Sequence, residues 1–107
     1  MSEAKSRERR VLEALQQKYE AKGFSFVKYP SRELIPPFLG DYTPDAIALG
    51  PHENIAIEVQ TNARASAEFP AAQIAERFRH QDRWKFELVF ADEAIGVGSK
   101  IPQLQRS

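Results

Sequence analysis

Apolar residues are spaced in two different ways along the chain, and the two spacings separate helices from strands. Near the N-terminus they recur every three or four residues up to Gly23, which is the pattern of an amphipathic helix followed by a stop signal. Later they gather in short runs rich in Ile, Val and aromatic residues, which predict strands. In chain order, the predicted elements are a helix over 2–22, strands over 24–29, 42–49 and 54–60, a helix beginning near Pro70, and a strand over 84–90.

The connections between these elements predict an α/β fold with a mixed sheet flanked by helices. The first three strands can form an antiparallel meander, whereas the last strand follows a helix, which implies parallel pairing. We expect an irregular loop over 30–41, because the pair Pro36-Pro37 does not continue regular structure. Glycine and proline beyond the last strand indicate a loose tail, so the expected folded domain is 1–92 and the tail 93–107.

The composition of this 107-residue chain fits one folded domain with one core, since 42% of the residues are apolar and 10% are aromatic. The chain contains no cysteine, which excludes disulfide frameworks, thiolate zinc sites and cysteine nucleophiles. No apolar run approaches the length of a membrane span, and the first residues are charged rather than signal-like. We therefore expect a cytoplasmic protein without membrane contact.

Two acids lie on neighbouring strands of a predicted hairpin. Asp45 directly precedes one apolar run, and Glu58 lies near the end of the next. The four-residue loop between the runs is expected to bring Leu49 opposite Asn54. In that register, antiparallel pairing puts Asp45 opposite Glu58, with Cβ atoms roughly 4.5–5.5 Å apart. Side chains alternate along a strand, so Gln60 points to the same face as Glu58.

Two neighbouring carboxylates in an apolar sheet need compensation, because like charges raise each other's pKa and burial of an ionised carboxylate is costly. Mg²⁺ supplies such compensation, since it takes one or two protein carboxylates and keeps positions for water and phosphate oxygens. Such a metal can acidify a bound water for phosphodiester hydrolysis. Taken singly, Asp45 is more commonly a turn-capping residue and Glu58 a solvent-facing acid. Their joint placement is what indicates a metal site.

A third acid shares the apolar stripe of the first helix. Glu8 lies three residues before Val11 and four before Leu12, whereas Glu13 and Glu20 fall on the polar side. We therefore expect Glu8, rather than Glu13, to point towards the sheet.

Fifteen basic and fifteen acidic residues cancel, so the net charge does not indicate a nucleic-acid partner. The basic residues are nevertheless clustered on the first helix and near the end of the second. Such clusters either contact phosphates or simply solvate two exposed helix faces. The residues considered for nucleic-acid contact are Arg7, Arg10, Arg64 and Arg77.

The order of elements, with Pro44-Asp45 opening the second strand and Glu58-Val59-Gln60 closing the third, resembles the PD-(D/E)XK nuclease superfamily. The most similar group is the small archaeal Holliday-junction resolvases with their bacterial relatives. The resemblance extends over about Ser6–Phe90 and implies a restriction-endonuclease-like αβββαβ core. It also makes Ser31 and Arg32, in the loop after the first strand, candidates for substrate contact.

Matched by position to this superfamily, Asp45 and Glu58 are the metal-binding acids, and the carbonyl of Val59 is a further ligand. Glu8 matches the acid that many members place on their first helix. The resemblance therefore implies a metal-dependent endonuclease, resolvase-like or defence-associated, with Mg²⁺ as cofactor, Mn²⁺ as a substitute and DNA as substrate. A domain of this size offers one active site, so cutting both strands of a duplex or a four-way junction would ordinarily need a homodimer.

Gln60 departs from the superfamily, which usually has lysine at this position. A lysine would help to hold the attacking water and balance the charge of the phosphate, whereas a neutral amide supplies no charge. Some restriction enzymes of the superfamily carry Gln or Glu here and still cleave, and Arg64 or a basic residue of the second helix could replace the missing charge. Three functions stay open: an active DNA endonuclease, a catalytically degenerate nuclease-fold module that binds nucleic acid or a protein partner, and a structural domain whose acids only bind backbone groups.

Overall fold

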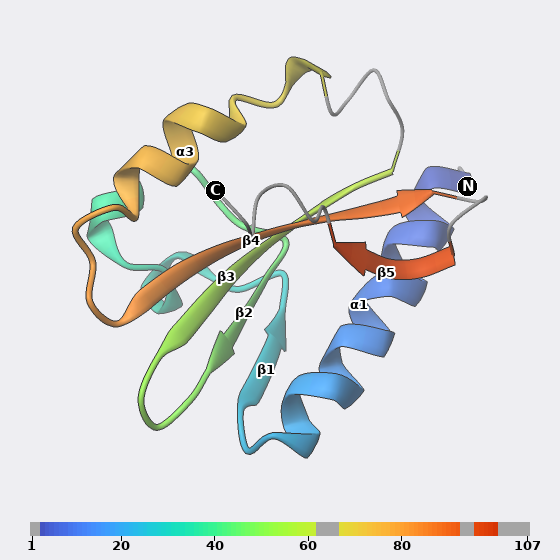
Figure 1. Cartoon of the computed structure of the whole chain (residues 1–107), viewed down its shortest axis with the longest axis horizontal. Coiled ribbons are helices and arrows are strands. Elements are labelled where there is room, and N and C mark those ends of the chain that lie inside the picture. Colours follow the sequence, from blue (N-terminus) through green and yellow to red (C-terminus); the bar gives the residue numbers. More distant parts are fainter. Residues whose placement is uncertain (1–2, 62–66, 93–95, 101–107) are drawn as a thin grey trace.

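Five strands form a single sheet in the order β1-β2-β3-β4-β5 (Figure 1). The structure is a computed structural model that describes residues 3–61, 67–92 and 96–100. The strands are β1 (Ser25–Lys28), β2 (Ala46–Leu49), β3 (Asn54–Gln60), β4 (Trp84–Asp92) and β5 (Gly96–Lys100). The helical elements include α1 (Glu3–Ala21), α3 (Ala71–Arg77) and the 3₁₀ turns η1 (Arg32–Leu34) and η2 (Pro37–Leu39). No helix in the described ranges is long and apolar enough to cross a membrane.

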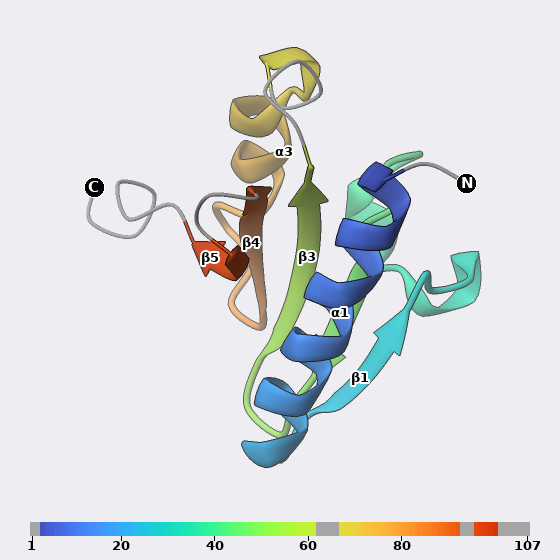
Figure 2. The same cartoon turned by 90° about the vertical axis from the view of Figure 1, so that its right-hand side faces the viewer.

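The strand pairing is that of the predicted mixed sheet. β1, β2 and β3 form an antiparallel meander, β4 pairs in parallel with β3, and β5 pairs in antiparallel fashion with β4. The hairpin register is also as predicted, because Leu49 is paired with Asn54 and Ala46 with Ile57. In Figure 2, the N-terminal turns of α1 lie beside the C-terminal end of β3. The predicted α/β fold, a mixed sheet flanked by helices, is therefore confirmed.

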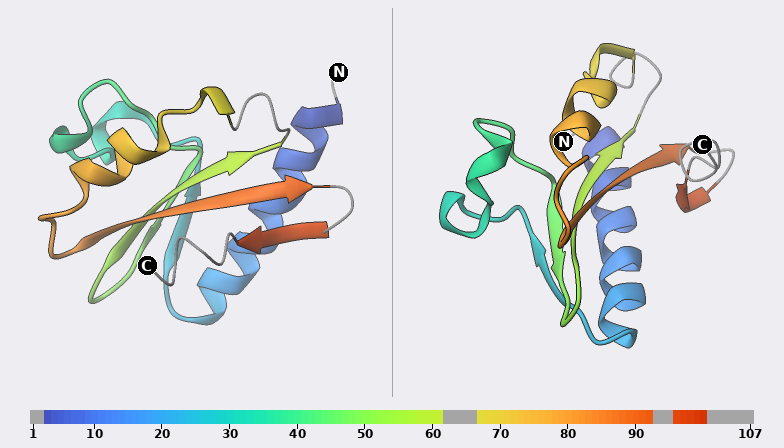
Figure 3. Two further views of the ribbon diagram at one scale, coloured as in Figure 1. Left: turned by 45° about the horizontal axis from the view of Figure 1, so that its top comes forward. Right: turned by 60° about the vertical axis from the view of Figure 1, so that its left-hand side comes forward.

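The two faces of the sheet are covered by different elements, α1 on one face and the η1–η2 segment with α3 on the other (Figure 3). The apolar spacing of this helix predicts burial of Ala71, Ile74, Ala75 and Phe78. Ile74 and Phe78 are buried, but Ala71 is half-buried and Ala75 is exposed, contrary to that prediction. Because α3 has only seven residues, a single i, i+4 pair reaches the sheet. Aromatic side chains surround this pair: Phe38, Tyr42, Phe69, Trp84 and Phe86.

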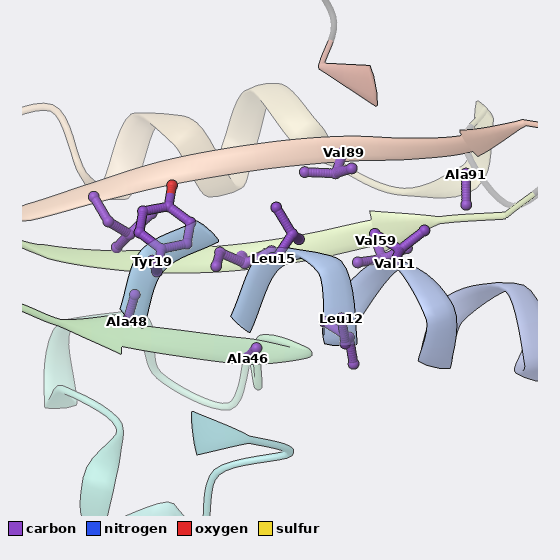
Figure 4. Packing of buried hydrophobic residues seen from close by; sticks show 11 residues of the cluster. Val11, Leu12, Leu15, Tyr19, Ala46, Ala48, Val59, Val89 and Ala91 are labelled. Atoms are coloured by element: carbon purple, nitrogen blue, oxygen red, sulfur yellow. The ribbon is translucent and has the colours of Figure 1, made fainter. Parts of the chain in front are cut away.

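The apolar stripe of α1 packs on the sheet as its spacing predicts (Figure 4). Its buried members are Val11, Leu12, Leu15 and Tyr19. They contact the inward side chains of three strands: Ala46, Ala48, Ile55, Ile57, Val59, Val89 and Ala91. Close packing of this kind fixes the helix against the sheet, and it thereby sets the position of the first turns of α1 relative to the end of β3.

Two segments that were expected to be irregular form ordered elements. The loop over 30–41 contains η1 and η2, and Pro37 begins η2, where its fixed φ and missing N–H are tolerated. Gly96–Lys100, expected within a loose tail, is strand β5. The backbone N–H and C=O groups at the edge of β4 can pair even with a segment that lacks alternating apolar residues. The remainder of the predicted tail, 93–95 and 101–107, lies outside the described residues.

Candidate active site

Asp45 lies directly before β2, where hydrogen bonds hold both its backbone and its carboxylate. Its carbonyl accepts from the Tyr29 N–H at 2.8 Å, and its own N–H donates to the Ile57 carbonyl at 2.9 Å. Its carboxylate Oδ2 accepts from the Val59 N–H at 2.8 Å. The N–H and carbonyl of a strand residue point the same way, so the Val59 carbonyl is directed to the same edge of β3 as the Asp45 carboxylate.

Glu58 lies near the end of β3 and is half-buried. Its two carboxylate oxygens accept hydrogen bonds from different side chains, Oε1 from the Tyr42 hydroxyl (2.7 Å) and Oε2 from Gln60 Nε2 (2.9 Å). Burial, followed by the negative charge of Asp45, raises the pKa of Glu58 from 4.5 to about 7. The two hydrogen bonds oppose this rise, and the charge of Glu8 adds to it. The three acids therefore interact electrostatically at one end of the hairpin.

Glu8 reaches this end of the sheet from the first half of α1. It is half-buried, and its Oε2 accepts a hydrogen bond from the Tyr29 hydroxyl at 2.5 Å. The adjacent Arg7 donates to the Thr61 carbonyl at 3.4 Å, so this turn of α1 lies against the segment that follows β3. The structure thus brings Glu8 within electrostatic reach of Glu58.

Gln60 occupies the position at which the superfamily usually has lysine. Its side chain is 6% exposed and shares a face of β3 with Glu58, to which its amide donates. A neutral amide lowers the pKa of Glu58 through this hydrogen bond alone, whereas a lysine would add a full positive charge. Gln60 therefore orients the Glu58 carboxylate but leaves its charge uncompensated.

Tyr42 is a site residue that no sequence motif indicated. Its ring packs against Phe69 and Phe86 while its hydroxyl donates to Glu58. Burial, followed by the charge of Glu58, raises the pKa of Tyr42 above its usual value, so the hydroxyl stays a donor at neutral pH. Its place three residues before Asp45, on the loop leading into β2, was the only available signal.

Tyr29 is the second such residue, and it lies directly after β1. Its N–H donates to the Asp45 carbonyl, and its hydroxyl donates to Glu8. Partial burial, followed by the hydrogen bond to Glu8, raises the pKa of Tyr29 above its usual value. Tyr29 thus links the strand that carries Asp45 to the helix that carries Glu8.

The arginines proposed for nucleic-acid contact lie in different surroundings. Arg7 is half-buried and Arg10 is exposed, both on α1. Arg77 donates to the Leu39 carbonyl at 2.5 Å and so ties α3 to η2. Arg64 lies outside the described residues. A contact of these residues with nucleic acid stays a prediction, and Arg77 in addition has a structural hydrogen bond.

The loop before Asp45 is held by its own polar side chains. Arg32 donates to the Gly40 carbonyl at 2.8 Å and to Thr43 Oγ1 at 3.3 Å, and Ser31 donates to Glu33 at 2.9 Å. These hydrogen bonds fix the conformation of the loop before β2, which places the Tyr42 hydroxyl next to Glu58. Substrate contact by Ser31 or Arg32 stays a prediction.

The oxygen atoms of Asp45, Glu58 and the Val59 carbonyl are donors of the kind that hard divalent cations take. Among the residues that the structure describes, no group of three or more His, Cys, Asp or Glu side chains is arranged to hold a metal ion. The predicted donor set contains only two carboxylates and one carbonyl, without Glu8. Burial and then the negative charge of Asp45 raise the pKa of Glu58, and the neighbouring hydrogen-bond donors only partly offset this rise. In its chemistry, two carboxylates and one carbonyl, the predicted donor set suits a divalent cation, whose charge would offset theirs.

A pocket of about 810 Å³ lies away from these acids, along the first half of β4. It is lined mainly by apolar side chains from β4 and α3, including Phe78, Trp84 and Phe86. None of Glu8, Asp45 and Glu58 lines it. The position of this pocket therefore does not identify the site formed by the acidic residues.

Comparison with protein families matches residues 1–102 to the AHJR-like family, described as REase_AHJR-like, a restriction-endonuclease-like family. No curated protein and no solved structure gives a significant match. The matched range includes α1, the acid-bearing hairpin and β4. It agrees with the resemblance to the PD-(D/E)XK superfamily and supports a nuclease-type function in general. The chain belongs to the AHJR-like family of restriction-endonuclease-like proteins.

Proposed function

We propose that this protein is a metal-dependent endonuclease that hydrolyses phosphodiester bonds in DNA, in a resolvase-like or defence-associated role. The observation that carries the proposal is the carboxylate pair at the open end of the β2–β3 hairpin, where burial and then the charge of Asp45 raise the pKa of Glu58 to about 7. Family membership supports it independently, since restriction-endonuclease-like families are nucleases that typically use divalent metals.

Asp45, Glu58 and the Val59 carbonyl would hold the metal, Mg²⁺ with Mn²⁺ as a substitute. When bound, a divalent cation supplies positive charge and lowers the pKa of a bound water. Tyr42 and Gln60 orient Glu58 by bonding one carboxylate oxygen each. The Val59 N–H does the same for Asp45. Hydrogen bonds that orient ligands in this way are a regular part of metal sites.

Glu8 is the third acid of the proposed site. Its charge contributes to the raised pKa of Glu58, so it adds to the negative potential that attracts a cation. Arg7 and Arg10, on the same part of α1, are the proposed contacts to the phosphates of DNA. A homodimer would supply the second site needed to cut both strands of a duplex.

One observation favours a second function, a degenerate nuclease-fold module that binds nucleic acid or a protein partner without cleaving it. Gln60 replaces the usual lysine, is buried, and already donates its amide to Glu58. With that arrangement, Gln60 offers no positive charge to a developing transition state. On this reading, substitution of Asp45 changes stability, because its carboxylate binds the Val59 N–H, but changes no activity.

The experiment that tests the proposal is cleavage of supercoiled, linear, single-stranded and four-way-junction DNA with Mg²⁺ or Mn²⁺. The native protein is compared with Asp45→Asn and Glu58→Gln, and the matched control is Asp41→Asn, which neutralises an exposed acid in the loop before β2. Metal-dependent cutting by the native protein and the control, lost in both site variants, is expected. Absence of cutting by folded native protein on every substrate would instead favour the degenerate module.

A further inference from the structure

We infer that the substrate of this site carries an unpaired base, and that this base stacks on the ring of Tyr29. The inference rests on the proposed function and narrows it, because it names the class of nucleic acid: DNA with a single-stranded gap or flap beside the scissile phosphate. Three independent features of Tyr29 carry it: its backbone conformation, its exposure and its two hydrogen bonds.

The backbone of Tyr29 has a φ of 51°, in the left-handed region that side chains disfavour. Among the described residues, Tyr29 is the one non-glycine residue with a positive φ. Glycine or asparagine would adopt this conformation at lower cost. Strained residues of this kind persist where the surrounding structure imposes them, and they concentrate at functional sites. The fold therefore places a bulky aromatic residue where the backbone alone favours a small one.

Burial of the ring does not compensate for this strain, because Tyr29 is 48% exposed. A tyrosine retained for the core would instead be covered, as Tyr19 is at 6% exposed. In the described part of the chain, the large apolar side chains that are exposed are Tyr29 and Leu34, which is 45% exposed. Both belong to the short segment between β1 and η2.

Hydrogen bonds at both ends of Tyr29 place its ring beside the acids. The backbone N–H donates to the Asp45 carbonyl at 2.8 Å, and the phenolic hydroxyl donates to Glu8 at 2.5 Å. The ring is thus held between two acidic residues of the proposed site while much of its surface stays open to solvent. An aromatic group fixed in this way is ready to bind without further ordering.

The chemistry that matches an exposed ring beside a phosphodiester site is an unpaired base. In a duplex, base faces are stacked on one another, whereas an unpaired base offers a π-face to an aromatic side chain. Leu34, five residues later, is the kind of apolar side chain that wedges between base steps. Between them in the sequence lie the exposed Arg32 and Glu33, whose opposite charges cancel, so this short stretch adds no net negative charge that would repel a phosphate.

The alternative is that Tyr29 only holds Glu8 through its hydroxyl. Two substitutions separate the roles. Tyr29→Phe keeps the ring and removes the hydroxyl, whereas Tyr29→Gly removes both and relieves the strained backbone. Tyr29→Asn, which also tolerates a positive φ, provides a second variant without the ring.

The test measures binding of a fully paired duplex and of the same duplex with a central single-stranded gap, in Ca²⁺ to prevent cleavage. A 2-aminopurine in the gap reports stacking through loss of its fluorescence. Asp41→Asn is the control, since Asp41 is exposed and lies outside the proposed site. Thermal unfolding of each variant shows whether the ring matters for the fold.

We expect native protein to prefer the gapped duplex and to quench the 2-aminopurine. In Tyr29→Gly and Tyr29→Asn, the ratio of the affinities for gapped and fully paired duplex should fall by about 5- to 100-fold, the range expected for one stacked base. The melting temperature of these variants should not fall. Tyr29→Phe should retain quenching. The inference is overturned if Tyr29→Gly keeps the native preference, if Tyr29→Phe loses as much as Tyr29→Gly, or if Tyr29→Gly unfolds at a markedly lower temperature. Equal binding and metal-dependent cutting of paired and gapped DNA would overturn it while leaving the proposed function intact, whereas neither binding nor cutting would overturn both.

Discussion

Replacing Glu58 with glutamine should stabilise the metal-free protein above pH 7, although it removes a proposed metal ligand. Glutamine keeps the shape of the side chain and an oxygen for the Tyr42 hydroxyl, but it carries no charge. The native fold, by contrast, holds an ionised Glu58 next to Asp45 in a partly buried position. The substitution therefore removes an electrostatic cost from the folded state.

The raised pKa sets the size of this effect. A rise from 4.5 to about 7, at about 1.4 kcal/mol per pKa unit, corresponds to about 3 kcal/mol. Solvent screens part of the interaction, so this value is an upper limit. Because the pKa of Glu58 is higher in the folded than in the unfolded protein, raising the pH from 4.5 to about 7 lowers the free energy of unfolding of native protein. Below pH 4.5 Glu58 is protonated in both states and this loss is absent. The increase in the free energy of unfolding caused by Glu58→Gln should therefore be absent below pH 4.5 and largest above pH 7.

Urea unfolding in EDTA measures this effect directly. The difference in the free energy of unfolding between Glu58→Gln and native protein should be near zero below pH 4.5 and reach about 1–3 kcal/mol above pH 7. Asp41→Asn, at an exposed position, should show no comparable gain. Mg²⁺ should then stabilise native protein more than Glu58→Gln, since binding to the folded state alone adds stability. A Glu58→Gln protein less stable than native above pH 7 in EDTA would show that the ionised Glu58 carboxylate does not destabilise the native fold.

Three further substitutions test the site and the core. Tyr42→Phe keeps the ring and removes the hydrogen bond that lowers the pKa of Glu58, so the acidic limb of the pH–rate profile should move to higher pH; an unmoved profile would contradict this role. Gln60→Lys restores the positive charge usual in the superfamily and should raise the rate of DNA cleavage with Mg²⁺, whereas an unchanged rate in a folded protein would argue against a charge deficit at this position. Leu12→Ala removes a fully buried side chain of α1 and should lower the free energy of unfolding by about 2–5 kcal/mol in urea titrations; a loss below about 1 kcal/mol would contradict the packing.

The hairpin could be predicted from the sequence because its register depends on local rules. The apolar runs, the four-residue turn and the alternation of side chains are enough to bring Leu49 opposite Asn54, as observed. The same rules place Gln60 on the face of Glu58, where it donates a hydrogen bond. Helical periodicity likewise predicted the buried stripe of α1. The metal-binding and catalytic roles of the acids stay predictions.

The features that the sequence patterns did not predict depend mostly on the conformation of irregular segments and on contacts between distant parts of the chain. Tyr42 reaches Glu58 only because η1 and η2 order the loop before β2, and no periodic signal describes such turns. Tyr29 contacts Glu8 across elements that are far apart in the sequence. Ala75 was expected to be buried, but a helix as short as α3 presents too narrow a face to the sheet. Strand β5 forms by backbone pairing with β4, which leaves little trace in side-chain patterns.

Whether Asp45 and Glu58 form a nuclease site is tested most directly by metal-dependent DNA cleavage. Native protein is compared with Asp45→Ala and Glu58→Ala on supercoiled, linear, single-stranded and four-way-junction substrates. If they do, native protein should cut DNA only with Mg²⁺ or Mn²⁺, and cutting should disappear in both variants while both remain folded. Cutting that persists in either folded variant, or no cutting of any substrate by folded native protein, would contradict this prediction.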